Sequence, residues 1–168
     1  MQINIVSMGC SKNLVDSERL MKRLSDAGFD VKFEMTVDDA DLIDIVVVNT
    51  CGFIGDAKEE SINTVLAWGE QRSEGRISGL YVMGCLSERH GDELKPEIPE
   101  VDGWYGKFDW GGIVSHLAGK YPSTADYDRM LTTPSHYCYM KISEGCNRFC
   151  AFCAIPLITG RHHSRPIE

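Results

Sequence analysis

Two kinds of hydrophobic pattern alternate along the first 119 residues. Short runs rich in β-branched residues predict strands at 3–10, 31–35, 43–49, 80–85 and 101–105. Apolar residues at helical spacing predict helices at 14–27, 57–70, 87–94 and 110–119. Strands that alternate with helices favour a parallel sheet, because a parallel connection has to cross over the sheet.

Two of these helices carry signals for their ends. The first has Leu20, Met21 and Leu24 on one stripe and is expected to stop at Gly28. The second is expected to have Asp56 as its N-cap. Its predicted apolar stripe consists of Ile62, Val65 and Leu66.

The strand pattern predicts an α/β fold, a five-stranded parallel sheet with helices on both faces. The commonest order for five strands is the flavodoxin-like order 2-1-3-4-5, in which the first, third and fourth strands are neighbours. These three strands run into Cys10, Cys51 and Cys85, whereas the second strand has no cysteine. We call these three residues the sheet-edge cysteines and expect their thiols to converge at the carboxyl ends of the strands, where open α/β sheets bind ligands. The alternative is that each is an ordinary buried small hydrophobe.

The chain changes character after residue 119. A stretch rich in Pro, Ser and Thr predicts a linker at 120–135, following a first domain at 1–119. The alternating run 137–143 predicts a strand in which Cys138 is packed. Residues 136–168 are therefore expected to open a second domain.

A second cysteine group follows that strand. Cys146, Cys150 and Cys153, here called the loop cysteines, have the spacing C-x-x-x-C-x-x-C directly after Glu144-Gly145. Three thiolates in a turn-permissive loop can hold three irons of a 4Fe-4S cluster and leave the fourth iron open. Zinc, with His162 or His163 as a further ligand, is the alternative, although structural zinc usually uses paired C-x-x-C knuckles.

Composition and charge exclude some classes of protein. The 168 residues are 43% hydrophobic and 25% charged, as in a soluble globular protein, and the net charge is −8 without a Lys/Arg run. That excludes the broad basic surface of a typical nucleic-acid binder. The acidic stretch 38–44 is expected to be a solvated loop. No run has membrane-spanning length and no signal peptide is apparent, so we expect a cytoplasmic protein whose seven cysteines serve metal or redox chemistry.

Four segments together carry a family resemblance. They are Met8-Gly-Cys10-Ser-Lys-Asn-Leu-Val-Asp-Ser-Glu18, Asn49-Thr-Cys51-Gly-Phe-Ile, Met83-Gly-Cys85-Leu, and Glu144-Gly-Cys146 through Cys153-Ala-Ile-Pro156. The chain resembles the methylthiotransferases of the radical S-adenosylmethionine (radical SAM) superfamily. The residues after Cys10, and Ala57-Lys-Glu-Glu-Ser-Ile62, look like the RimO branch, which modifies the β-carbon of an aspartate in a small-subunit ribosomal protein.

The resemblance implies a division of labour between two 4Fe-4S clusters. The cluster on the loop cysteines would bind SAM at its open iron and generate a 5′-deoxyadenosyl radical, with Phe152 near the adenine. The cluster on the sheet-edge cysteines would carry the methylated sulfur. The implied partners are the ribosomal protein, an electron donor such as flavodoxin or ferredoxin, and a sulfur donor, with no membrane. Most of the radical SAM barrel is absent from the sequence, so we expect a fragment that does not turn over alone.

Alternatives remain at this stage. A tRNA adenosine methylthiotransferase is the rival within the family, and a noncatalytic iron-sulfur module for electron transfer is the rival outside it. Lys12, Asn13 and Asp16 follow Cys10 closely and could tune its cluster, or, for Asn13, cap the helix. The aromatic residues Trp104, Tyr105 and Trp110 are assigned to core or interdomain packing.

Overall fold

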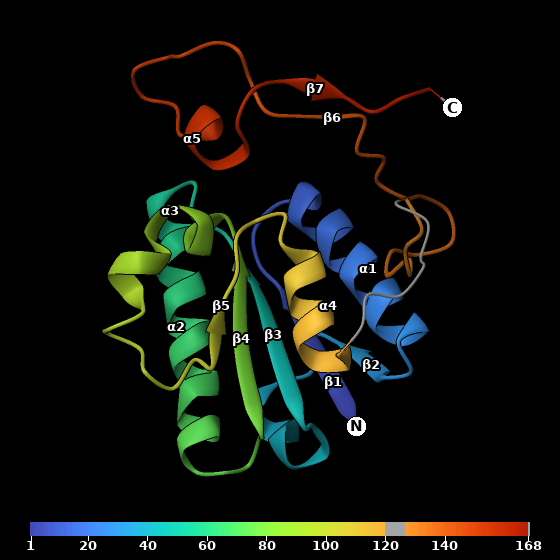
Figure 1. The fold of residues 1–168 in the computed structure, drawn as a ribbon, viewed down its shortest axis with the longest axis vertical. Coiled ribbons are helices and arrows are strands. Elements are labelled where there is room, and N and C mark those ends of the chain that lie inside the picture. The colour runs from blue at the N-terminus through green and yellow to red at the C-terminus, as the bar shows by residue number, and fades with distance from the viewer. Residues whose placement is uncertain (120–126, 168) are drawn as a thin grey trace.

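A computed structural model describes residues 1–119 and 127–167, so part of the predicted linker lies outside the described residues. All five strands of the main sheet are parallel, in the order β2-β1-β3-β4-β5, which confirms the predicted fold and strand order (Figure 1). The strands are β1 (Gln2–Ser7), β2 (Asp30–Phe33), β3 (Ile45–Thr50), β4 (Gly79–Gly84) and β5 (Gly103–Trp104).

Three helices and a 3-10 turn connect the strands of the main sheet, and a fourth helix follows β5. They are α1 (Ser11–Asp26), η1 (Val37–Leu42), α2 (Gly55–Ser73), α3 (Cys85–Leu94) and α4 (Trp110–Ala118). Gly28 follows α1 with φ +98°, a conformation that glycine adopts without strain, so the predicted stop is confirmed. The acidic stretch forms η1, whose Asp39 bonds back to Thr36 in a capping box.

The predicted N-cap of α2 is wrong, and Asn13 does not take the capping role that was one of its two open alternatives. The N-cap of α1 is Cys10, and Asn13 lies inside the helix, where tertiary contacts use its amide. The N-cap of α2 is Ile54. The Ser61 hydroxyl accepts a hydrogen bond from the Cys51 N–H at 2.9 Å, and this contact holds the start of α2 close to the end of β3. The predicted stripe of α2 is also partly wrong, since Val65 is buried but Leu66 is 43% exposed.

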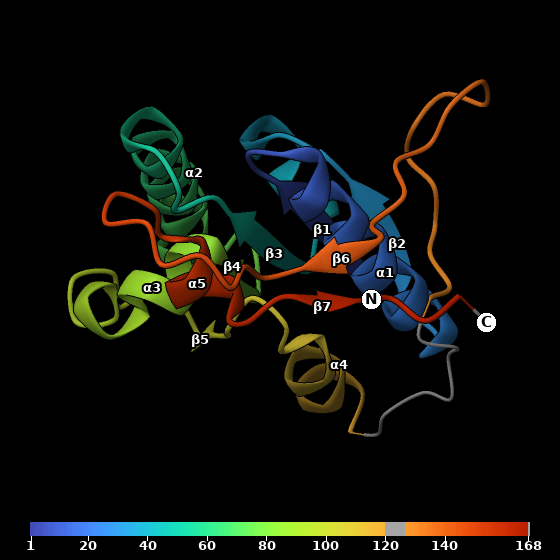
Figure 2. The ribbon, with the colours of Figure 1, turned by 90° about the horizontal axis from the view of Figure 1, so that it is seen from above.

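Residues 127–142 run beside α1, and residues 143–164 lie across the carboxyl ends of the main strands (Figures 1 and 2). They contain β6 (Ser143–Glu144), which pairs antiparallel with β7 (His163–Ser164), and the short helix α5 (Ile155–Thr159). The beginning of a barrel is not visible in the described part of the chain. The predicted strand at 137–143 is wrong except for its last residue, because side chains take up its carbonyls: Thr133 bonds the Tyr137 oxygen and Arg129 the Tyr139 oxygen. Cys138 is consequently exposed, not packed.

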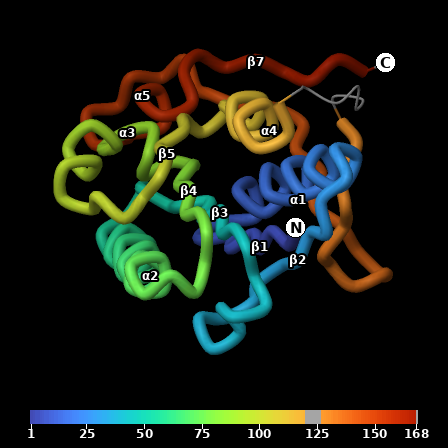
Figure 3. The backbone as a smooth tube through the Cα atoms, turned by 60° about the horizontal axis from the view of Figure 1, so that its bottom comes forward, coloured from blue at the N-terminus to red at the C-terminus, as the bar shows by residue number. Residues whose placement is uncertain are grey.

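The core has two halves, one on each face of the sheet. Figure 3 shows the sheet between α2 on one side and α1 with α4 on the other. The α2 side buries Val46, Val48, Val65, Trp68 and Leu80 among others, and the opposite side buries Ile5, Leu20, Leu24, Val47 and Ile113 among others. Alternate residues of β3 thus face opposite layers, as in a strand covered on both faces. Among the described helices, none is both long and apolar enough to span a bilayer.

Candidate functional site

The fold brings the sheet-edge cysteines to one edge. Cys10 follows β1, Cys51 follows β3, and Cys85 is the first residue of α3 directly after β4. Cys10 is exposed, Cys85 is half-buried and Cys51 is buried with 7% of its surface accessible. A Cβ placed on Gly9 would lie 2.7 Å from the Cys51 sulfur, so the turn before Cys10 packs directly on Cys51.

Glycine before a cysteine is required at two of these turns. Gly84 has φ +104°, and a Cβ there would lie 2.4 Å from the Thr50 carbonyl oxygen. Gly9 has φ +86° and is equally crowded. Any other residue would combine backbone strain with a clash. The two Gly-Cys pairs therefore set the distance between neighbouring strand ends, which in turn positions the thiols.

The buried side chain of Asn13 connects the strand ends at this edge of the sheet. Its side-chain amide donates to the carbonyls of Met8 and Thr50, both at 3.0 Å, and so ties the ends of β1 and β3 together. Its Oδ1 accepts from Lys107 Nζ at 3.1 Å and, more weakly, from the Cys85 thiol at 3.7 Å. Asn13 is completely buried, so its role is to hold the strand ends and not to cap a helix.

Lys107 is a residue that the sequence reasoning missed. Its ammonium is buried, with 3% of the side chain exposed, and lies beside Asn13, Asp16 and Cys85. Burial raises the pKa of the Cys85 thiol, the Lys107 charge opposes that rise, and the Cys51 and Cys10 thiols add to it. Burial alone would lower the pKa of Lys107, but the neighbouring anionic groups, Asp16 foremost, raise it. The signal that could have found Lys107 is its position just past the carboxyl end of the fifth strand, at the same edge as the cysteines.

A chain of ion pairs runs from this edge to the second half of the molecule. Asp16 bonds Lys107 at 3.3 Å and Lys141 at 2.6 Å, Lys141 pairs with Glu144, and Glu144 lies 3.8 Å from Lys12. We call these five residues the lysine–carboxylate network. Burial works against ionisation of Glu144, but its bond to Lys141 and the surrounding lysine charges lower its pKa overall. The network carries three positive and two negative charges, so it favours an anionic neighbour.

The loop cysteines are held by local backbone contacts. The Cys146 N–H donates to the Gly160 carbonyl at 3.1 Å, and the Cys153 N–H to the Cys150 carbonyl at 3.1 Å. Gly145 has φ +75° and passes so close to residue 161 that it has no room for a Cβ. Cys150 is exposed, while Cys146 and Cys153 are half-buried.

The neighbours of the loop cysteines are mostly open to solvent. Phe152 is 93% exposed and Phe149 is 76% exposed. His162 and His163 are also exposed, and the His162 N–H bonds the Asn147 side chain at 3.1 Å. The structure therefore leaves both histidines in the return strand and loop and does not bring them to the cysteines as ligands.

A contact between two helices lies beside the two cysteine groups. α5 follows Cys153 and packs on α3, whose first residue is Cys85 (Figure 2). Within residues 1–119 and 127–167, no group of three or more His, Cys, Asp or Glu side chains is close enough for a single metal ion. A cubane cluster spreads its thiolates over different irons, so its ligands are set wider apart than those of one ion. Three thiols around one edge, beside a buried ammonium, fit an anionic cluster better than a single zinc ion.

Comparisons with known proteins agree with the motifs. The profile described as "Uncharacterized protein family UPF0004" matches residues 2–106. The chain is 58% identical over 168 residues to "Ribosomal protein uS12 methylthiotransferase RimO" of Porphyromonas gingivalis. Proteins with the same name in Bacteroides fragilis and Prosthecochloris aestuarii are 56% and 51% identical, each over 166 residues.

These alignments cover 99% of this chain but only 38%, 38% and 37% of the three relatives. The chain thus spans less than two fifths of the length of the curated relatives it matches. The names of these relatives confirm the resemblance to the RimO branch of the methylthiotransferases that the four segments indicated.

Proposed function

The chain belongs to the UPF0004 family, and we propose that the whole protein is a methylthiotransferase that adds a methylthio group to the β-carbon of an aspartate in the ribosomal protein uS12. Sequence identity carries the proposal, and the placement of three cysteines supports it. The sequence is more than half identical to proteins named for this activity, and the fold gathers Cys10, Cys51 and Cys85 from three separate strands. Ordinary core cysteines have no reason to occupy the same end of three neighbouring strands.

Each cysteine group then has a role. Cys10, Cys51 and Cys85 would hold one 4Fe-4S cluster, and Cys146, Cys150 and Cys153 the other. When loaded, the clusters supply the radical from S-adenosylmethionine and the sulfur that is transferred. The packing of α5 on α3 links the segment after Cys153 to Cys85. The fold also keeps Cys51 away from water and sets a buried ammonium, Lys107, beside Cys85. Phe152 is proposed to contact the adenine of SAM, since it is exposed beside Cys153.

The proposal includes partners and location. An electron donor such as flavodoxin or ferredoxin, and a sulfur donor, would serve the two clusters in the cytoplasm. We propose a division into an α/β domain at 1–119, a linker at 120–135 and the opening of a radical SAM domain at 136–168. The net charge of −8 suits a basic ribosomal protein better than tRNA as substrate.

Iron and acid-labile sulfide per chain after anaerobic reconstitution test the cluster sites. We expect about eight irons in the unaltered chain and about four in Cys51→Ala and in Cys150→Ala. Cys138→Ala is the matched control, because Cys138 is exposed and belongs to neither group, and it should keep about eight. About four irons that Cys51→Ala does not change would show that the sheet-edge cysteines bind no cluster.

The substrate requires the full-length protein. With SAM and a reductant it should modify uS12 and leave tRNA unmodified, as followed by mass spectrometry. Modification of tRNA alone would favour the rival activity within the family. Loaded clusters that neither bind nor cleave SAM would instead indicate an electron-transfer module.

A further inference from the structure

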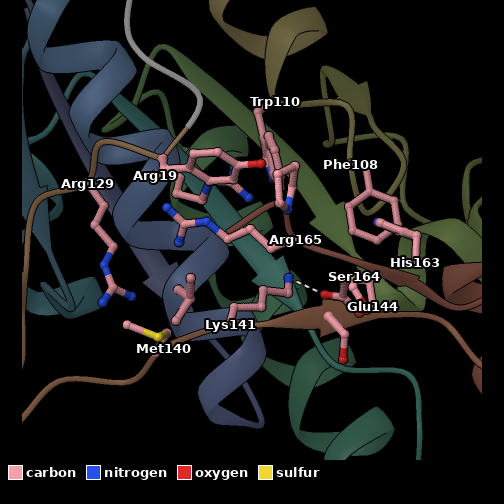
Figure 4. A pocket seen from close by; sticks show the side chains of 14 residues that line it. Arg19, Phe108, Trp110, Arg129, Met140, Lys141, Glu144, His163, Ser164 and Arg165 are labelled. Carbon is pink, nitrogen blue, oxygen red and sulfur yellow. Dashed lines mark ion pairs between the residues drawn. The ribbon is translucent and has the colours of Figure 1, made fainter. Parts of the chain in front are cut away.

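A separate hollow lies between α1, α4 and the β6–β7 pair (Figure 4). It has a volume of about 380 Å³, the size of a small-molecule site, and no cysteine is among its described lining residues. It is therefore distinct from both proposed cluster sites.

The lining is strongly cationic in a chain whose net charge is −8. Arg19, Arg129, Lys141 and Arg165 contribute positive charge, and Glu144 is the acidic residue among the described lining. Arg129 pairs with Glu18 at 3.3 Å, and Lys141 pairs with Asp16 and Glu144. Arg165 has no carboxylate partner within the described residues and adds its charge to that of Arg19 beside it.

Aromatic rings hold two of these guanidinium groups in place. The Arg165 guanidinium carbon lies 3.5 Å from the centre of the Tyr127 ring, and that of Arg19 lies 4.6 Å from the centre of the Trp110 ring. A stacked guanidinium keeps its N–H groups in the plane parallel to the ring, so that they donate sideways. Each pair thus places a rigid donor on the wall of the pocket, and Figure 4 shows Arg19, Trp110 and Arg165 grouped around the same hollow.

One buried donor at this pocket is left without an acceptor. The Trp110 indole N–H is buried and makes no hydrogen bond within the described part of the chain, although Trp110 lines the hollow. Burying an N–H without an acceptor is unfavourable, and native structures rarely tolerate it. A ligand oxygen in the pocket would satisfy this group.

We propose that this pocket binds a phosphate monoester through Arg19, Arg165 and the Trp110 N–H. A phosphoryl group offers three charged oxygens in different directions, which suits donors arriving from α1, from α4 and from the residue after β7. A carboxylate has two oxygens in one plane and a single charge, so it matches fewer of these donors. An RNA strand would need an extended basic surface, but the net charge is −8 and the sequence has no Lys/Arg run.

The test is a titration of the 168-residue chain with inorganic phosphate. Calorimetry measures the binding, and the midpoint of thermal unfolding is recorded at each phosphate concentration. We expect saturable binding and a rise in the midpoint with phosphate. Trp110→Phe keeps a ring for Arg19 to stack on but removes the N–H, and Arg165→Gln removes the charge. Each should weaken phosphate binding by about tenfold or more.

Arg76→Gln is the matched control, because Arg76 pairs with Asp41 far from the pocket, and it should bind phosphate like the unaltered chain. A far-UV spectrum of each variant checks that it is folded. Absence of saturable binding, or equal weakening by Arg76→Gln, would overturn the proposal. So would tighter binding of malonate or of a short RNA, which would identify a carboxylate or a nucleic-acid site. Iron loading is measured independently, so failure here leaves the proposed function standing.

Discussion

The sheet-edge cysteines and the loop cysteines are held by different kinds of structure. Cys10, Cys51 and Cys85 come from three strand ends that are far apart in sequence and are fixed by a buried sheet. The loop cysteines lie within eight residues of one another and depend on a few backbone bonds in a largely exposed loop.

This difference shows what holds the thiols of each group in position. At the sheet edge, folding of the core has already overcome the entropy cost of bringing the thiols together, so the site is preorganised. In the loop, close sequence spacing makes that cost small but leaves the thiols exposed. There the bound cluster has to complete the order. The lysine–carboxylate network connects the sheet edge to the segment that carries the loop cysteines.

Breaking the lysine–carboxylate network should have the largest effect on the free energy of unfolding. Asp16 is 1% exposed and bonds both Lys107 and Lys141, so Asp16→Asn leaves two buried ammoniums short of a counter-charge. We expect a loss of about 4 kcal/mol in the free energy of unfolding, the cost of opening a buried ion pair. Urea denaturation measures the loss, and trypsin should cut within 127–167 sooner than in the unaltered chain.

The matched control for this change is Asp92→Asn. Asp92 pairs with Lys95 but its side chain is 99% exposed, so its removal should leave the urea midpoint unchanged. Equal effects of the two substitutions would mean that the network does not couple the two regions.

Crowding the strand ends should have the next largest effect. Gly84→Ala puts a Cβ against the Thr50 carbonyl at φ +104°, and we expect a loss of about 3 kcal/mol from strain and overpacking together. Gly75→Ala is the control, because Gly75 has φ +74° but open space around it, so only the strain of about 1 kcal/mol applies. Urea midpoints of the two variants separate crowding from strain. Equal losses would show that the close approach of the strand ends does not constrain the site.

Thiol reactivity in the iron-free chain should separate the two groups by a smaller margin. Exposed Cys150 should react with iodoacetamide at pH 8 about tenfold faster than buried Cys51. Cys85 should also be slow, because burial raises its pKa and lowers the thiolate fraction at any given pH, so its rate should rise at higher pH. Lys107→Met removes the charge that opposes this rise in pKa, and should slow Cys85 further while leaving Cys150 unchanged. Mass spectrometry of the labelled peptides gives the rates, and labelling of all three at one rate would contradict the contrast in burial.

The sequence allowed the strand order and the meeting of the three strand ends to be predicted, because both follow from local periodicity and from the rules of parallel sheets. It did not allow the roles of Asn13 and Lys107 to be predicted. Each depends on partners distant in sequence: the Asn13 amide is taken by Met8 and Thr50, and Lys107 reaches across to Asp16. A preference for helix caps says nothing about which tertiary group competes for the side chain.

The wrong strand at 137–143 has a similar cause. Its alternation fits a strand, but a strand exists only where a neighbour supplies the ladder, and here Thr133 and Arg129 bond its carbonyls instead. The spacing of hydrophobic residues therefore predicted the elements of residues 1–119 well and those of residues 127–167 poorly. The first region makes its contacts through a large core, and the second makes them through charges and loops.

Acid should have the smallest effect on the free energy of unfolding, and it should act on Glu144, next to the loop cysteines. The fold lowers the pKa of Glu144, so its ionisation stabilises the folded state. This contribution is complete above the unfolded pKa of about 4.3 and is lost as the pH falls through the lower folded value. The difference in unfolding free energy between the unaltered chain and Glu144→Gln should be about 1 kcal/mol at pH 6 and shrink below about pH 4. Urea titrations at pH 6 and pH 3 give this difference, and pepsin at pH 3 should cut within 127–167 before it cuts the main sheet. A difference that is the same at both pH values would mean that Glu144 acts through its shape and not through its charge.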